Sequence, residues 1–154
     1  MNIQIDDTDR RILRRLLAEP NLAANELADR AGVTPATVSR RLEKLTKSGV
    51  IRGTMAVIDW SKLGYEVEVS LRLTLDKTNS RAFDELTTAA RNIPEVTEIQ
   101  TFLGRVDLRL HVIARDMGHY QTIYRDKILT LPHITDIEAL MQVATIKREE
   151  ALPL

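Results

Sequence analysis

The side chains most able to do chemistry are cations gathered in one short segment, residues 34–53. This segment contains a single acid, Glu43, and five basic residues: Arg40, Arg41, Lys44, Lys47 and Arg52. An arginine fork can bind a guanine edge or a phosphate through two parallel hydrogen bonds, whereas a lysine is a flexible point charge suited to phosphates. The segment therefore predicts a surface that contacts double-stranded DNA.

The rest of the chain has few residues arranged for catalysis or for metal binding. There is no cysteine, which excludes disulfides, thiol catalysis and cysteine-based zinc sites. The three histidines, His111, His119 and His133, show no regular ligand spacing. An enzyme would have to use Asp107, His111 and His119, whose local context is a plain hairpin and helix. We therefore predict a protein that is not an enzyme and has no metal site and no cofactor.

The charge of the chain is unevenly distributed. The net charge of all 154 residues is zero. Residues 1–64 hold eleven Lys and Arg against eight Asp and Glu, a net charge of +3, whereas residues 65–154 hold eleven against fourteen, a net charge of −3. A locally basic region in a neutral chain is compatible with nucleic-acid binding by that region alone.

Length and hydropathy place the chain among small globular proteins of one or two domains. No apolar run approaches the roughly 18 residues of a membrane-spanning helix. The N-terminus, MNIQIDDTDRR, is too acidic and polar for a secretory signal. We therefore predict a cytoplasmic protein without a membrane partner.

Three short helices are expected in the first third of the chain. Apolar residues at helical spacing follow Asp6 and Asp7, and a second helix is expected over residues 24–30, ended by Gly32. Thr34 is the predicted N-cap of the third helix, with a proline in the first helical position and Gly49 as the stop signal. Two helices joined by a short turn, the second exposed and basic, form a helix-turn-helix, which is typical of DNA-binding proteins.

The third helix is predicted to enter the major groove by its N-terminal end. Small side chains at Ala36, Thr37 and Ser39 would allow close approach to base edges, and Thr37 could contact a base edge or a thymine methyl group. Arg40 could bind guanine. The alternatives are an ordinary solvated surface, or a winged helix that contacts protein.

The remaining cations are predicted to have other roles. Lys44, Lys47 and Arg52 suit phosphates, which position a protein without specifying sequence. Arg41 lies at the flank of the helix, where it could read bases or instead pair with a packed acidic group. Residues 50–58 are predicted to form a short hairpin or wing.

The last two thirds of the chain predict an α+β domain. Residues 66–75 alternate between apolar and polar side chains, which indicates a half-buried strand. The next elements are a helix over 79–92, strands over 96–103 and 107–114, a helix over 116–131 and a strand over 134–147. This βαββαβ order is the ferredoxin-like arrangement. The sheet face away from the helices is expected to be apolar and to associate with a second copy, through Ile99, Thr101, Leu103, Ile113, Leu140 and Ile146.

The whole pattern resembles the Lrp/AsnC family of bacterial transcription regulators. The resemblance is carried by IDDTDRRILRRLL, ELADRAGVTPATVSRRLEKLTKSGVIRG, LGRVDLRLHVIARDMGHY and LPHITDIEALMQVATIK. It implies a helix-turn-helix domain over residues 1–53, a strand linker over 54–65, and an effector-binding and oligomerisation domain over 66–154. It also implies a homodimer that can assemble into octamers.

The resemblance further implies a small-molecule effector, usually an amino acid, bound near a Gly-x-x-Asp hairpin. Here that motif is Gly104 and Asp107, with Leu103 and Arg105 at positions where the family commonly has a small polar and an acidic residue. Asp107 could hold the ammonium group of an amino acid and Arg105 its carboxylate. Asp107 could equally be a carboxylate that caps the turn. The rival function is an architectural protein that packs DNA without responding to an effector.

Overall fold

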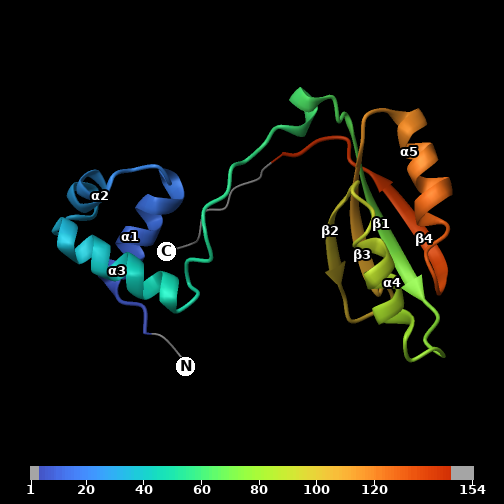
Figure 1. Ribbon diagram of the computed structural model, residues 1–154, viewed down its shortest axis with the longest axis horizontal. Helices are drawn as coiled ribbons and strands as arrows, with labels where there is room; N and C mark the ends of the chain where they lie inside the picture. Colours follow the sequence, from blue (N-terminus) through green and yellow to red (C-terminus); the bar gives the residue numbers. More distant parts are fainter. Residues whose placement is uncertain (1–3, 147–154) are drawn as a thin grey trace. The chain divides into compact units, whose positions relative to one another are not determined.

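The computed structural model describes residues 4–146, which divide into a unit that ends at Val57 and a unit over Ile58–Ile146. The first unit contains the helices α1 (Asp7–Ala18), α2 (Ala24–Ala31) and α3 (Pro35–Lys47) (Figure 1). These are the three helices predicted from the apolar spacing. The three helices pack together around a small hydrophobic core. Its buried residues are Ile12, Leu27, Ala28, Ala31 and Val38, and the partly buried side chains of Leu22, Val33 and Leu42 pack against them.

The ends of these helices are fixed by local chemistry. Asp6 caps α1 in a reciprocal capping box with Asp9, which satisfies two backbone N–H groups at the helix start. Gly32 ends α2 with a positive φ of 66°, which a residue with a side chain adopts at a steric cost. Thr34 caps α3, as predicted, and its side chain accepts a hydrogen bond from the backbone of Thr37. The turn between α2 and α3 is therefore specified by its own residues.

The hairpin or wing predicted over residues 50–58 is not formed within the described chain. Residues 52–59 have neither helix nor strand, and a 3₁₀ turn follows over Trp60–Leu63. The apolar side chains of this segment are exposed, with Met55 at 85% and Val57 at 88%. A strand needs a partner for its backbone groups, and the single chain supplies none here.

The second unit has the predicted βαββαβ order. Its elements are β1 (Val67–Leu75), α4 (Ala82–Ala90), β2 (Val96–Thr101), β3 (Leu108–Ala114), α5 (Met117–Ile123) and β4 (Ile134–Met141), with a π-helical segment over Tyr124–Ile128 extending α5. The sheet order is β2-β3-β1-β4, and each neighbouring pair is antiparallel. Residue 147, at the end of the predicted last strand, lies outside the described residues.

One face of this sheet carries the core, and α4 and α5 cover it (Figure 1). The alternation in β1 places Val69, Leu71 and Leu73 on that face, where each is fully buried. Near the start of α4, Phe83 is 43% exposed, whereas its neighbour Ala82 is buried. The helix begins three residues later than predicted, at Ala82 rather than at residue 79.

The opposite sheet face is more polar than predicted. The register shifts between Val96 and Glu98, so that Ile99 pairs with Leu110 on the helix-covered face. Because side chains alternate with a period of two, one extra residue in β2 moves every later side chain to the other face. Thr101 moves with Ile99, while Leu103 lies beyond the end of β2 and Ile146 beyond the end of β4.

Ion pairs occupy much of this open face. Arg109 contacts Glu98 at 3.1 Å and Arg72 contacts Glu138 at 3.4 Å, in both cases between neighbouring strands. Of the predicted residues, the register leaves two on this face: Ile113, which pairs with Glu68, and Leu140, which is 36% exposed. The expectation of a largely apolar face was therefore wrong, because it assumed an unbroken alternation in β2.

Within residues 4–146, no helix has the length and apolar character needed to cross a membrane. Over the same range, no group of three or more His, Asp or Glu side chains could hold a metal ion.

Candidate nucleic-acid interface and ligand sites

The N-terminal end of α3 presents small side chains and one arginine to solvent. Ala36, Ser39 and Arg40 are all exposed. The hydroxyl of Thr37 lies 2.9 Å from that of Thr34, so Thr37 is held against the cap while remaining partly accessible. Across residues 4–146, the Arg40 guanidinium has no ion pair or side-chain hydrogen bond. Arg40 is therefore free to bind an external acceptor.

Arg41, the next residue, is held by α1 instead. Its Nη1 donates to Asp6 Oδ2 at 2.6 Å and to Asp9 Oδ1 at 3.2 Å. The Arg41 side chain is 20% exposed, and the Asp9 side chain is fully buried. The hydrogen bond to Asp6 raises the pKa of Arg41, which keeps the guanidinium charged. The sequence left two roles open for Arg41, base readout or pairing with a packed acidic group. The observed geometry is the second, an ion pair with Asp6 and Asp9.

Lys44 shares the same acids. Its Nζ lies 3.4 Å from Asp9 Oδ2 and donates to the backbone oxygen of Gln4 at 3.3 Å. Its side chain is 42% exposed, so a part of it still faces water. Two of the predicted DNA-contacting cations are thus already bound within the chain.

Lys47 and Arg52 are more accessible. Lys47 forms an i,i+4 pair with Glu43 at 2.6 Å, and the two side chains are 76% and 64% exposed. An exposed ion pair of this kind contributes little to the free energy of folding, so Lys47 can leave Glu43 at a small energetic cost. Arg52 follows α3 and is exposed. Both remain suited to phosphates.

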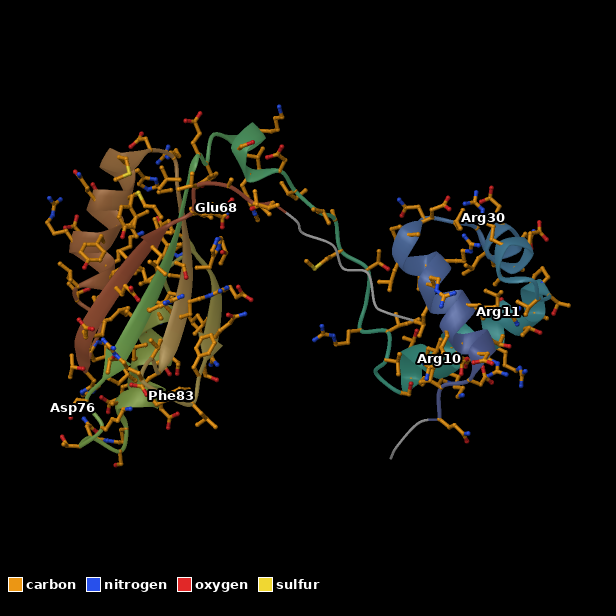
Figure 2. The ribbon with its side chains drawn as sticks, turned by 180° about the vertical axis from the view of Figure 1, so that it is seen from behind. Arg10, Arg11, Arg30, Glu68, Asp76 and Phe83 are labelled. Carbon is orange, nitrogen blue, oxygen red and sulfur yellow. The ribbon has the colours of Figure 1, made fainter. Side chains whose placement is uncertain are left out.

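Further cations of the first unit were not predicted as part of this surface. Figure 2 shows Arg10 and Arg11 on α1 and Arg30 on α2. Arg11 donates to the hydroxyl of Thr8 at 3.3 Å, and its guanidinium lies near Gly32, where an added Cβ would meet it at 3.6 Å. Arg30 pairs with Glu19. The signal was present in the sequence as RRILRR, four arginines in six residues (10–15).

The predicted effector hairpin is a loop of exposed residues between β2 and β3. Leu103 is fully exposed, Arg105 is exposed, and Gly104 has a φ of 154°. Asp107 is different, because its side chain is only 20% exposed. The structure therefore keeps these residues together but turns Asp107 toward the sheet.

Both oxygens of the Asp107 carboxylate have partners within the unit. Oδ2 accepts a hydrogen bond from the backbone N–H of Leu75 at 2.9 Å, and Oδ1 lies 3.4 Å from Lys77 Nζ. Lys77 also donates to the backbone oxygen of Gly104 at 3.4 Å. These contacts join the end of β1 to the hairpin, which is the capping role that the sequence left open.

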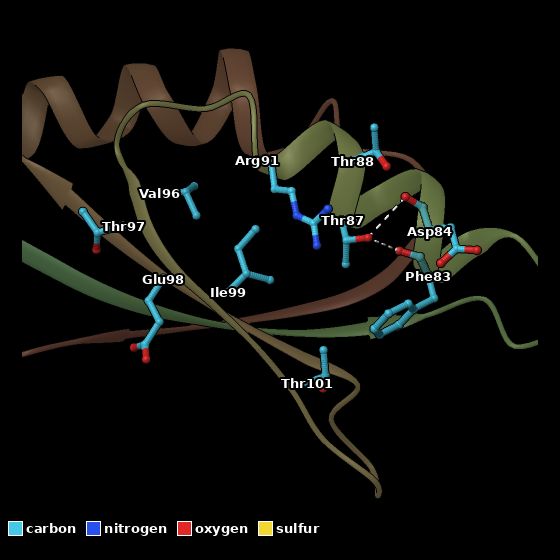
Figure 3. Close-up of a pocket in the computed structure, with 10 residues that line it drawn as sticks. All are labelled: Phe83, Asp84, Thr87, Thr88, Arg91, Val96, Thr97, Glu98, Ile99 and Thr101. Atoms are coloured by element: carbon cyan, nitrogen blue, oxygen red, sulfur yellow. Dashed lines mark hydrogen bonds between the residues drawn. The ribbon is translucent and has the colours of Figure 1, made fainter. Parts of the chain in front are cut away.

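A groove of about 570 Å³ lies between α4 and β2 (Figure 3). Apolar side chains form part of its lining, among them Phe83, Val96 and Ile99. The hydroxyl of Thr87 is used within the helix, where it donates to the backbone oxygens of Phe83 and Asp84 at 2.9 and 3.2 Å. The groove was not predicted from the sequence, since its lining comes from two elements, α4 and β2, that only the folded chain brings together.

Two charged side chains in this groove have no partner within residues 4–146. Arg91 and Asp84 both line it, and neither side chain has an ion pair or hydrogen bond among residues 4–146. They are seven residues apart, so they lie on the same face of the α4 turns. The groove thus offers a cation, an anion and an apolar surface to a small ligand.

The three histidines are hydrogen-bonded to carboxylates or lie beside them. His111 Nε2 lies 3.0 Å from Glu68, and His133 Nε2 lies 2.6 Å from Glu85, whose pKa is lowered by the hydrogen bond from His133. His119 accepts a backbone hydrogen bond from Arg115. None of them contacts Asp107 among the described residues, so the set considered for an enzyme is not assembled.

Two protein families match this chain, and together their matches span nearly all of its residues. Residues 5–52 match the family described as winged helix-turn-helix DNA-binding, and residues 68–152 match the Lrp/AsnC ligand binding domain. The transcriptional regulator AzlB of Bacillus subtilis is 27% identical over 154 residues, which cover 100% of this chain and 98% of that protein. The regulator Rv2324 of Mycobacterium tuberculosis is 35% identical over 118 residues, which cover 77% of this chain and 78% of that protein.

Solved structures agree with these matches. The transcriptional regulator NMB0573 of Neisseria meningitidis, in complex with L-Met, superposes with a TM-score of 0.91 at 25% identity, covering 97% of each chain. An AsnC family transcriptional regulator from Agrobacterium tumefaciens superposes with a TM-score of 0.87 at 29% identity, covering 96% of each chain.

Proposed function

Because the chain belongs to the Lrp/AsnC family of transcription regulators, we propose that α3 reads specific DNA sites and that the second unit binds a small effector and joins copies of the chain. The chain is a DNA-binding transcription regulator rather than an enzyme. We also place the protein in the cytoplasm, where a transcription regulator meets its DNA.

The observation that carries the DNA assignment is the contrast between Arg40 and Arg41. Arg40 is exposed and unpaired among the described residues, beside the small side chains of Ala36 and Ser39, whereas Arg41 is tied to acids of α1. Base readout needs an unpaired donor that can approach a base edge closely. We therefore assign base contact to Arg40 and Thr37 and not to Arg41.

The other DNA residues fall into two groups. Lys47 and Arg52 are assigned to phosphates, with Lys44 contributing only to the extent that it leaves Asp9. Thr34 acts through the helix cap, because its oxygen already accepts the Thr37 N–H. Ala36 and Ser39 contribute by their small size.

The test uses fluorescence anisotropy on a duplex from upstream of the protein's own gene and on a scrambled duplex, across a salt series. Arg40→Ala is expected to weaken binding to the native duplex by about 1–3 kcal/mol while scarcely changing binding to the scrambled one. Lys47→Ala is the matched control, expected to weaken both equally and to reduce the salt slope by about 1. Equal losses for Arg40→Ala on both duplexes would move Arg40 to the phosphate group.

An architectural DNA-packing role is the alternative function. It predicts equal binding of the wild-type protein to both duplexes, a steep fall with salt, and no response to metabolites. The additional arginines of α1 are the observation that favours it, because they enlarge the basic surface beyond α3. The same anisotropy series separates the two functions.

The proposed effector is an amino acid, in line with the L-Met complex of the Neisseria meningitidis regulator. One candidate site is the hairpin of Leu103, Gly104, Arg105 and Asp107. There Arg105 is free to bind a carboxylate, but both Asp107 oxygens already have partners. The hairpin alone thus lacks an open partner for the ammonium group.

The groove between α4 and β2 is the second candidate, favoured by its Arg91 and Asp84, which are unpaired among the described residues. Isothermal titration with a panel of amino acids distinguishes the sites. Loss of binding in Arg105→Ala but not in Arg91→Ala would assign the hairpin, and the reverse would assign the groove. Binding that survives both substitutions would refute both sites.

We also propose a homodimer that assembles further into octamers. The exposed apolar side chains of Met55, Val57 and Ile58 support self-association, since they have no cover within the described part of the single chain. Sedimentation equilibrium on the wild-type chain measures the state directly. A monomer at micromolar concentration would refute this part of the proposal.

A further inference from the structure

The carboxylate of Asp9 is unusual in being a buried charge at the base of the recognition helix. Of the charged residues that the structure describes, it is the one that is buried, and its side chain has no exposed surface. A buried charge is costly unless it is paired and hydrogen-bonded. Its capping-box contact with the Asp6 N–H accounts for one of its hydrogen bonds, and its other contacts call for a separate account.

The partners of Asp9 lie on the DNA-reading helix. Oδ1 accepts from Arg41 at 3.2 Å, and Oδ2 lies 3.4 Å from Lys44 Nζ and 3.3 Å from the backbone N–H of Asp6. Asp6 adds a second contact to Arg41 at 2.6 Å. Asp9 and the N-cap residue Asp6 thus hold two cations of α3, across 32 or more residues of sequence.

This arrangement changes what α3 offers to DNA. Arg41 and Lys44 would otherwise add two positive charges to the exposed surface of α3, where they would bind any phosphate. Holding them against α1 leaves Arg40 as the unpaired arginine of the described helix and fixes the orientation of α3 on α1. Charge-assisted contacts of this kind are geometrically specific, because a guanidinium binds in its own plane.

We propose that Asp9 is a positioning residue that determines DNA specificity, by withholding Arg41 and Lys44 from phosphates and fixing the direction in which Arg40 points. The inference rests on the proposed function, since it presumes that α3 reads DNA. Its distinguishing consequence is that loss of the Asp9 charge strengthens binding to unrelated DNA. A residue that only stabilised the fold would not have that effect.

The experiment compares Asp9→Asn with Asp7→Asn in the full chain. Asp7 is a matched control, because it lies in the same first turn of α1, is exposed, and has no side-chain partner among the described residues. Both substitutions remove one negative charge. Anisotropy is measured on the native and scrambled duplexes between about 50 and 200 mM salt, with circular dichroism to confirm folding at the assay temperature.

Freeing Lys44 should steepen the salt slope on the scrambled duplex by about 0.9 for each bound subunit, and by up to about 1.8 if Arg41, which keeps its 2.6 Å contact to Asp6, is released as well. A fourfold rise in salt then weakens that binding by an extra factor of about 3.5 to 12 relative to wild type. The preference for the native duplex should fall correspondingly at low salt. Asp7→Asn should leave the slope and the preference close to wild type.

The proposal is overturned if Asp9→Asn and Asp7→Asn give the same slope and the same preference. If Asp9→Asn proves unfolded, the Asp6→Asn variant tests the proposal in its place. The Asp6 side chain is 46% exposed, and of the two cations it contacts Arg41 but not Lys44. This variant should then steepen the slope by up to about 0.9, and equality with Asp7→Asn would refute the idea. A wild-type protein with no preference for the native duplex would instead refute the proposed function.

Discussion

Replacing Asp107 by alanine separates its two possible roles, in the fold and in effector binding. The carboxylate accepts the Leu75 N–H at 2.9 Å and lies 3.4 Å from Lys77, with 20% of its side chain exposed. Alanine leaves the Leu75 N–H without its acceptor at the end of β1. If Asp107 is a structural cap, the substitution should destabilise the second unit whether or not an effector is present.

The expected magnitude follows from these contacts. A partly buried N–H that loses a charged acceptor costs about 1–3 kcal/mol. The ion pair adds less than about 1 kcal/mol, because Lys77 is 63% exposed and such pairs are screened by water. We expect a loss of about 2 kcal/mol, which lowers the melting temperature of a domain of this size by about 10 °C.

Urea unfolding followed by circular dichroism, at a fixed protein concentration, measures this loss. Asp107→Asn keeps an oxygen that can accept the Leu75 N–H and should lose less than about 1 kcal/mol, while Lys77→Ala isolates the ion pair. If Asp107→Ala unfolds like the wild type but abolishes the response to an amino acid, the capping argument is refuted and Asp107 is a ligand contact.

Three further predictions test the fold around both units. Leu86→Ala, at a fully buried position of α4, should cost about 2–5 kcal/mol in denaturant unfolding, whereas Leu129→Ala, 54% exposed, should cost less than about 1; similar losses would contradict the assigned core. Thr34→Ala should remove the cap of α3 at a cost of about 0.5–2 kcal/mol and speed amide exchange at the Thr37 N–H, and unchanged exchange would argue against the cap. The backbone hydrogen bond from Asp9 lowers the pKa of Asp6, so its stabilising effect is complete above the unfolded value of about 3.9 and is lost as the pH falls through the lower folded value. Melting curves between about pH 2 and 6 should therefore show a stability loss that is smaller in Asp6→Asn, and identical pH profiles would contradict this.

Local signals in the sequence were sufficient for most of the elements. The caps at Thr34 and Gly32 and the alternation in β1 depend on residues within one turn or one strand, so they can be read from spacing alone. The same holds for the order of helices and strands in both units. The exposed position of Arg40 also follows from helical periodicity, once the apolar stripe of α3 is known.

Other features depend on contacts between distant residues. Asp9 and Arg41 are 32 positions apart, and periodicity could place Arg41 only at the flank of its helix, without naming its partner. The linker residues 52–59 formed no hairpin, because apolar character does not supply the partner strand that backbone groups require.

Capping, periodicity and charge act over a few residues, so the amino-acid order was enough to specify the fold class, the helix-turn-helix and its basic recognition helix. Packing between elements selected which of those cations remain free, which face of the sheet Ile99 joins, and where a groove opens beside Arg91. The physical reason is that the partner of a side chain comes from another element of the fold, and a single shifted residue in β2 reverses the faces that an unbroken alternation predicts.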